Sequence, residues 1–146
     1  MITIIQRVKQ ASVSVDRQII SQIDQGIMAL VAVEKNDSEQ QAQRLLERIL
    51  NYRIFADDEG KMNRSLRDIQ GGLLLVPQFT LAADTRKGNR PGFASAAPPE
   101  QGRELFSYLQ QLATTLYPAT EFGRFGADMQ VALINDGPVT FTLQVR

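Results

Sequence analysis

The chain has 146 residues, of which 43% are apolar, and this suits one globular domain that covers residues 1–146. It contains no cysteine and no histidine, which excludes disulfides, thiolate nucleophiles and the usual general base near neutral pH. Sixteen basic residues balance sixteen acidic ones. This balance argues against a surface that coats nucleic acid broadly, but it permits local recognition of one RNA end.

The start of the chain and its apolar runs indicate where the protein acts. No basic segment followed by a long apolar one opens the sequence, so we expect no signal peptide. The longest apolar run, residues 27–33, is much shorter than the roughly 20 residues of a membrane span. We therefore expect a cytoplasmic protein that does not enter a membrane.

The first third of the chain is predicted to contain strands followed by a helix. Ile2 and Ile4, and later Val13 and Val15, alternate with polar neighbours, as strand residues do, and a turn follows at residues 16–18. The apolar run that Gly26 opens is typical of a strand buried on both faces. A capping box then begins a helix whose apolar face contains Ala42, Leu45, Leu46, Ile49 and Leu50, the box being formed by Ser38 and Gln41.

The middle of the chain is predicted to contain two more strands and a polar loop. Residues 53–56 indicate a short strand that ends in a turn at 57–60. Two glycines precede a buried strand at 73–76, which continues into the segment 77–81. The segment 84–93 is a polar loop.

The last third is predicted to contain a second helix and a pair of strands. Two prolines open the helix, and its buried face is marked by Leu105, Leu109, Leu112 and Leu116. The strand pair follows at 129–133 and 139–145. Together the elements predict a compact α/β domain with a curved, barrel-like mixed β-sheet and two main helices.

Taken on residue pattern alone, the candidate sites remain open. Gln78 to Leu81 is either an ordinary strand end or a ligand site beyond a carboxyl strand end, where free N–H groups can hold an oxyanion. The pattern of Asn135 to Pro138 most readily predicts a hairpin turn. Pro138 weakens this interpretation, because it has no N–H group to donate to the strand that follows. Asp57 to Glu59 is the best carboxylate group, but a solvated turn is favoured over a metal site. We expect no metal and no cofactor.

Several segments, taken in order, closely resemble the D-aminoacyl-tRNA deacylase family, also called the D-tyrosyl-tRNA deacylase family. The resemblance spans almost the whole chain. The segments that carry it are residues 5–8, 26–35, 52–55, 60–63, 78–85, 90–91, 127–131 and 135–140.

The family's first motif is Ser-Gln-x-x-Leu, and residues 77–81 carry it here as Pro-Gln-Phe-Thr-Leu. The resemblance implies that Gln78, Phe79 and Thr80 are the catalytic residues and lie beside the scissile ester. Pro77 departs from the family, because it removes the hydroxyl and the N–H group of the expected serine.

The second motif, Asn-x-Gly-Pro-Val-Thr, is matched at every position by residues 135–140. The resemblance implies that Gly137 and Pro138 form a Gly-cis-Pro element, supported by Arg7, that enters the active site of a partner subunit and excludes L-amino acids. The functional unit is then a homodimer. Phe125 and Met129 are similar to residues that line the family's pocket for the terminal adenosine of tRNA.

The resemblance thus implies a hydrolase that binds the acceptor end of aminoacyl-tRNA. It would cleave the ester of D-aminoacyl-tRNA and of mischarged glycyl-tRNA, with the neighbouring ribose 2′-hydroxyl activating water. Thr80 as a nucleophile is the alternative mechanism, but it would need a base, and none stands close by in sequence. The alternative function is a non-catalytic module that binds an RNA end, and Pro77 is the feature that favours it. An esterase for small metabolites is disfavoured, since no serine-hydrolase elbow is present.

Overall fold

A long first strand organises the sheet. In the computed structural model, which describes residues 1–146, β1 (Ile2–Val15) pairs antiparallel with β3 (Gly26–Ala32) along its first half. Its second half pairs with β2 (Gln18–Ile23), and β8 (Gln130–Gln144) pairs with both halves on the other side. The ladder with β8 shifts register around Val8, so both strands bend there.

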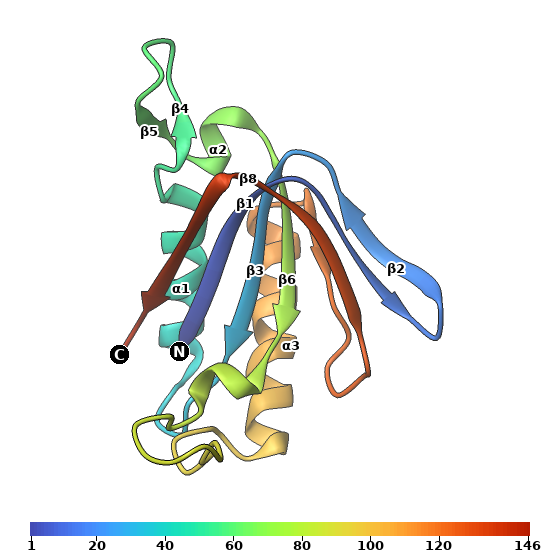
Figure 1. Cartoon of the computed structure of the whole chain (residues 1–146), viewed down its shortest axis with the longest axis vertical. Coiled ribbons are helices and arrows are strands. Elements are labelled where there is room, and N and C mark those ends of the chain that lie inside the picture. The colour runs from blue at the N-terminus through green and yellow to red at the C-terminus, as the bar shows by residue number, and fades with distance from the viewer.

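Two parallel strands complete the sheet. β6 (Gly72–Pro77) lies beside β3, and β7 (Thr120–Phe122) lies beside β6, which gives the order β2-β1-β3-β6-β7 with β8 on β1. The bent halves of β1 and β8 arch over this part with β2, so the sheet is a nearly closed barrel (Figure 1). The predicted curved, mixed sheet is confirmed.

Two main helices lie together behind one face of the sheet, α1 (Glu39–Asn51) and α3 (Pro99–Leu116) (Figure 1). The predicted capping box of α1 is present, with Ser38 and Gln41 exchanging hydrogen bonds. The main core of 23 buried residues fills the space between these helices and the sheet. A smaller cluster of 7 buried residues lies on the opposite face, under the arched strands.

Short elements connect these parts. The hairpin of β4 (Phe55–Ala56) and β5 (Met62–Arg64) follows α1, and the single turn α2 (Leu66–Ile69) leads into β6. The 3-10 helix η1 (Phe79–Ala82) follows β6 directly. None of the helices is both long and apolar enough to cross a membrane.

Three expectations about these elements were wrong. Residues 129–145 do not form a strand pair around a turn, since β8 is continuous through residues 135–138. The reason is the length of β1, which is enough for both halves of β8 to pair with it rather than with each other. The strand predicted at 53–56 is limited to Phe55–Ala56, and Leu116 is 42% exposed because α3 ends at that residue.

Candidate functional site

The segment predicted to be catalytic lies at the carboxyl end of β6. The Gln78 N–H donates to the Val31 carbonyl at 2.7 Å, which extends the pairing with β3 by one residue before η1 begins. Phe79 is 58% exposed and packs against Phe93, with ring centroids 5.1 Å apart. Thr80 is also exposed. The sheet therefore presents this segment at its rim rather than burying it.

Thr80 has no base to activate it. Its Oγ1 accepts a hydrogen bond from Nε2 of Gln78 at 2.6 Å, and it makes no hydrogen bond to a carboxylate or a lysine. Phe79 and Thr80 are the first two residues of η1, so their N–H groups lack an acceptor within the helix. What this segment offers to a reacting group is main-chain polarity and an amide, not an activated hydroxyl.

A cavity of about 300 Å³ adjoins this segment and is largely apolar. Gln78 and Phe79 form one wall, and Phe125 lies on another, with the guanidinium carbon of Arg103 4.9 Å from its ring centroid. The remaining lining residues are Val31, Val33, Pro77, Ala97, Pro99, Gly102, Phe106 and Gly126. The structure thus brings Phe125 together with Gln78 and Phe79, which lie more than forty residues earlier in the sequence.

Met129 lies behind this cavity and does not line it. Its Sδ accepts the N–H of Arg124 at 3.3 Å, and a side chain at Gly123 would meet that sulfur at 3.0 Å. The thioether supports the loop that carries Phe125. Thr80, likewise, is absent from the cavity wall.

The second predicted segment is a rigid projection of β8. Gly137 and Pro138 are exposed and joined by a cis peptide bond. Residues 136–139 have no paired partners in β1. Gly137 has φ +135°, and a Cβ atom there would lie 2.7 Å from Cγ2 of Val139. Only glycine fits this position.

Side chains on both flanks brace the projection. Arg7 donates from Nε to the Asp136 carbonyl at 3.0 Å and from Nη1 to the Ile54 carbonyl at 2.8 Å. Asn135 closes the loop, because its amide accepts the Val139 N–H at 2.9 Å and donates to the Val139 carbonyl at 3.1 Å. Each polar residue of this motif therefore has an identified partner.

The two segments lie at opposite ends of the sheet. Asn135 is level with Val8, Gly26 and Gly72, at the start of β6, whereas Gln78 follows its last residue, Pro77. Five residues of strand separate these levels, about 17 Å at about 3.3 Å per residue. In Figure 1 the bend of β8 is at the top and the segment that follows β6 is at the bottom. Gly137 cannot reach the cavity of its own chain.

Comparison with known proteins identifies the family of this chain. The sequence profile of D-Tyr-tRNA(Tyr) deacylase matches residues 4–144. The chain belongs to the D-Tyr-tRNA(Tyr) deacylase family. The expectation of an enzyme from this family, whose members are hydrolases that act on ester bonds, is therefore confirmed.

Relatives of the family are similar over nearly the whole chain. The D-aminoacyl-tRNA deacylase of Pseudomonas entomophila (strain L48) is 61% identical over 97% of this chain and 98% of its own length. The enzyme of that name from Pseudomonas aeruginosa (strain LESB58) is 59% identical over 99% of both chains.

Two solved structures also match. The c-Myc DNA Unwinding Element Binding Protein has a TM-score of 0.93 and 40% identity, with 100% of this chain and 99% of that chain covered. A chain described as "a probable eukaryotic D-amino acid tRNA deacylase" has a TM-score of 0.85 over 99% and 98% of the two chains. Its identity of 16% means that it supports the fold alone.

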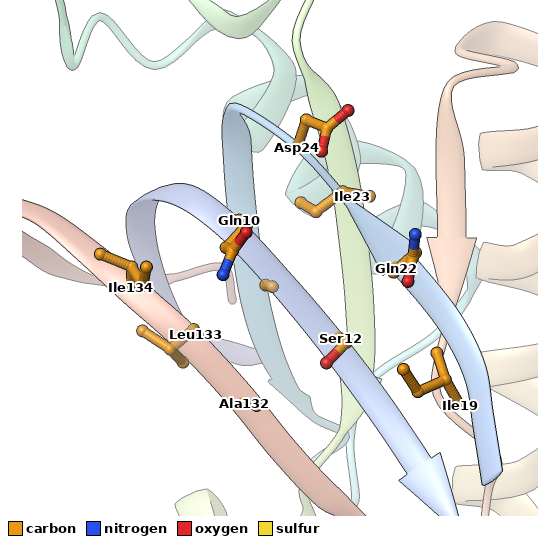
Figure 2. Close-up of a pocket in the computed structure, with 10 residues that line it drawn as sticks. Gln10, Ser12, Ile19, Gln22, Ile23, Asp24, Ala132, Leu133 and Ile134 are labelled. Atoms are coloured by element: carbon orange, nitrogen blue, oxygen red, sulfur yellow. The ribbon is translucent and has the colours of Figure 1, made fainter.

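A second hollow, of about 430 Å³, lies on the arched part of the sheet, away from both family motifs (Figure 2). Gln10 and Ser12 of β1 point into it between β2, which carries Ile19 and Gln22, and β8, which carries Ile134. None of the predicted site residues lines it.

Carboxylates do not form a metal site. No group of three or more Asp and Glu side chains lies close enough to hold a metal ion. The hydrogen bond from the Asn63 side chain, with further bonds from the Lys61 and Glu59 N–H groups, lowers the pKa of Asp57. The hydrogen bonds from Arg86 hold the pKa of Asp84 well below its usual range. The hydrogen-bonding oxygens of both carboxylates are thus used by neighbouring residues of the same turn.

Sequence reasoning missed Arg103, Gly102 and Phe106, which line the cavity beside Gln78 from α3. The sequence pattern indicated only that these residues belong to a helix. The spacing of Gly102 and Phe106 by four residues places them on one face of α3, and glycine on a buried helix face is the one signal that pointed to a close neighbour. A Cβ atom at Gly102 would lie 3.3 Å from the Phe125 ring.

Proposed function

We propose that this chain hydrolyses the ester bond between a D-amino acid and the terminal ribose of tRNA, and that it also accepts glycyl-tRNA. The observation that carries the proposal is the cavity beside Gln78 and Phe79, in a chain whose relatives are D-aminoacyl-tRNA deacylases. Its size and apolar walls suit a nucleoside, with Phe125 as a stacking surface. The ester of a bound terminal adenosine would then lie over η1. We place this activity in the cytoplasm.

In the proposed mechanism, a group of the substrate activates the attacking water. The chain has no histidine or cysteine, and the Thr80 hydroxyl accepts from an amide. An aminoacyl ester is already activated, so the neighbouring 2′-hydroxyl can assist water once the ester is held in place. The main-chain N–H groups of Phe79 and Thr80 would stabilise the oxyanion that forms.

Chirality would be selected by exclusion from across a homodimer. Gly137 and Pro138 form a braced, exposed projection about 17 Å along the sheet from their own cavity, so a two-fold partner is what would receive it. The partner's main-chain oxygens would occupy the space of an L side chain, while a D side chain would point outward. Glycine has no side chain to be excluded, so glycyl-tRNA would be accepted.

Paired deacylation assays on D-tyrosyl-tRNA and L-tyrosyl-tRNA test the reaction. We expect hydrolysis of the D ester and of glycyl-tRNA, with the L ester left intact, and no loss of the hydrolytic step in excess chelator. Equal rates on the D and L esters would contradict the exclusion mechanism. Restoration of a chelated enzyme by one specific metal would contradict the mechanism based on the 2′-hydroxyl.

Mixed dimers test whether sites are shared between subunits. Gly137→Ala damages the projection, and Gly102→Leu places a side chain in the cavity. Each variant alone should have little activity. An equal mixture, after subunit exchange, should recover about a quarter of wild-type sites, because half the dimers contain one intact pair of elements. No recovery, with exchange verified by mass, would contradict the cross-subunit site.

A non-catalytic module that binds a nucleic-acid end is the second candidate. Two observations favour it: Pro77 replaces a hydroxyl at the cavity wall, and one relative of known structure is the c-Myc DNA Unwinding Element Binding Protein. Tight binding of uncharged tRNA without any turnover of D-tyrosyl-tRNA would establish this candidate over the first. Pro77→Ser, which restores the family residue, should then restore turnover.

A further inference from the structure

A third pocket, with a mixed polar and apolar lining, adjoins the cavity proposed to hold the nucleoside. It has a volume of about 450 Å³, and it shares three residues with that cavity, which are Arg103, Phe106 and Phe125. Its other lining residues are Ile20, Ser107, Gln110, Phe122, Gly123 and Arg124. Residues 103, 107 and 110 are spaced to lie on one face of α3, and Arg124 approaches from the loop after β7. Two elements distant in sequence thus converge on one pocket.

The charge of this pocket is one-sided. Its lining contains two arginines and no acidic residue, although the whole chain has as many acidic residues as basic ones. Neither Arg103 nor Arg124 forms an ion pair within the chain. Both guanidinium groups are on exposed residues. The pocket is therefore a local site for an anion, with amide and hydroxyl groups from Gln110 and Ser107 beside it.

Arg103 is oriented by the same ring that would hold the nucleoside. Its guanidinium carbon lies 4.9 Å from the Phe125 centroid, and stacking on an aromatic face reduces the freedom that the side chain loses when it binds. The planar guanidinium group matches two oxygens of a phosphate. Arg103 thus stands at the boundary between the two pockets.

We propose that Arg103 and Arg124 form a subsite for the phosphodiester backbone immediately preceding the terminal adenosine of tRNA. This inference rests on the proposed function, in that the cavity receives the adenosine. The subsite reads no base. It recognises a single-stranded RNA end by charge, and it places the ester over η1 by holding the strand on the far side of Phe125.

Binding of two small probes tests the subsite without any need for catalysis. The trinucleotide CpCpA contains the phosphates and adenosine lacks them. We expect wild-type protein to bind CpCpA at least about tenfold more tightly than adenosine in an NMR titration. Arg124→Gln should reduce this gap and leave the affinity for adenosine unchanged, because Arg124 does not line the adenosine cavity. Arg103→Gln should weaken the binding of CpCpA by a larger factor than the binding of adenosine. Arg44→Gln is the matched control, because Arg44 is exposed on α1 and also lacks an ion pair.

Salt and substrate length sharpen the test. Each lost phosphate contact should make the dependence of log affinity on log salt shallower by about 0.7, the value for single strands. On D-tyrosyl-tRNA each glutamine variant should lower kcat/KM by about tenfold, and Arg124→Gln should hydrolyse 3′-O-D-tyrosyl-adenosine at the wild-type rate. Arg103→Lys retains the charge and should retain most of the salt dependence.

The possible results separate the subsite from the reaction. Equal affinity of wild type for CpCpA and adenosine overturns the subsite. An equal loss of CpCpA and adenosine binding in Arg103→Gln also overturns it, because Arg103 would then only support the Phe125 wall. An intact affinity gap in a protein that hydrolyses no D-tyrosyl-tRNA supports the subsite and overturns the proposed catalysis alone.

Discussion

The two ends of the sheet are built in opposite ways. At one end, Gly137 and Pro138 project from β8 and are tied down by hydrogen bonds from Arg7 and Asn135. At the other end, the segment after β6 that is predicted to be catalytic is exposed and has a single side-chain hydrogen bond, between Gln78 and Thr80. One end is a braced projection and the other is an open cavity wall.

In the proposed mechanism, this difference explains how a catalyst without histidine can be selective. The projection that would exclude one enantiomer has to resist displacement, and its polar groups are used internally. The wall that would meet the reacting ester keeps its main-chain groups free. A single loop could not both satisfy its polar groups internally and keep them free. The fold places these two functions in separate segments at the two ends of the sheet.

The largest expected effect is at the braced end, in Gly137→Ala. The new Cβ atom would lie 2.7 Å from Cγ2 of Val139 and 2.9 Å from Nη2 of Arg7, at a φ of +135°. We expect the free energy of unfolding to fall by about 2 kcal/mol, from urea titration. Deacylation of D-tyrosyl-tRNA should fall by about 100-fold, because the projection moves.

Gly60→Ala is the matched control for Gly137→Ala. Gly60 also has a positive φ, of +80°, but a Cβ atom there meets nothing within 4 Å. It should cost some stability and leave deacylation unchanged. If both variants lost activity equally, backbone strain alone would explain the result, and the special position of Gly137 would have no support.

Removal of the brace should have the next largest effect. Arg7→Ala leaves the Asp136 and Ile54 carbonyls without their charged donor. We expect a loss of about 2 kcal/mol in the free energy of unfolding, with deacylation about tenfold slower because the projection is less well held. Arg7→Lys can reach only one of the two carbonyls and should fall between wild type and Arg7→Ala. Wild-type activity in a folded Arg7→Ala protein would show that the brace is not needed.

A smaller effect is expected at the open end, in Thr80→Ala. The Thr80 hydroxyl receives a hydrogen bond but has no base, so single-turnover deacylation should stay within about tenfold of wild type. A fall of about four orders of magnitude would identify a covalent nucleophile instead. Thr80→Ser, which retains the hydroxyl, separates loss of the nucleophile from loosening of Gln78.

The smallest effect is expected in the β4–β5 hairpin, which begins one residue after Ile54, whose carbonyl accepts from Arg7. The Asn63 side chain is the main group that lowers the pKa of Asp57. A lowered folded pKa contributes stability above the unfolded value of about 3.9, and this stability is lost as pH falls through the folded pKa. Asn63→Ala should therefore be slightly less stable than wild type at pH 7. The two unfolding curves should converge as pH falls below about 4, with deacylation at pH 7 unchanged. A gap that widens in acid would contradict this sign.

The sequence by itself determined the features that repeat locally. Apolar periodicity and the pair Ser38 and Gln41 specify α1 before any tertiary contact forms. The ordered set of segments from residues 5–8 to 135–140 indicated the family, and some of its residue types are tied to local geometry, such as a glycine where φ is +135°. The mixed, curved sheet followed from the alternation of strands and helices.

Only the tertiary structure decided which of these pieces meet. Whether residues 129–145 fold back or continue depends on pairing with β1, more than 100 residues earlier, and no local pattern encodes that register. The same ladder sets Gly137 and Gln78 at opposite ends of the sheet. The convergence of Arg103 and Arg124 is likewise invisible in sequence, because a lone arginine on a helix and another in a loop each resemble ordinary solvated charge until the fold places them in one pocket.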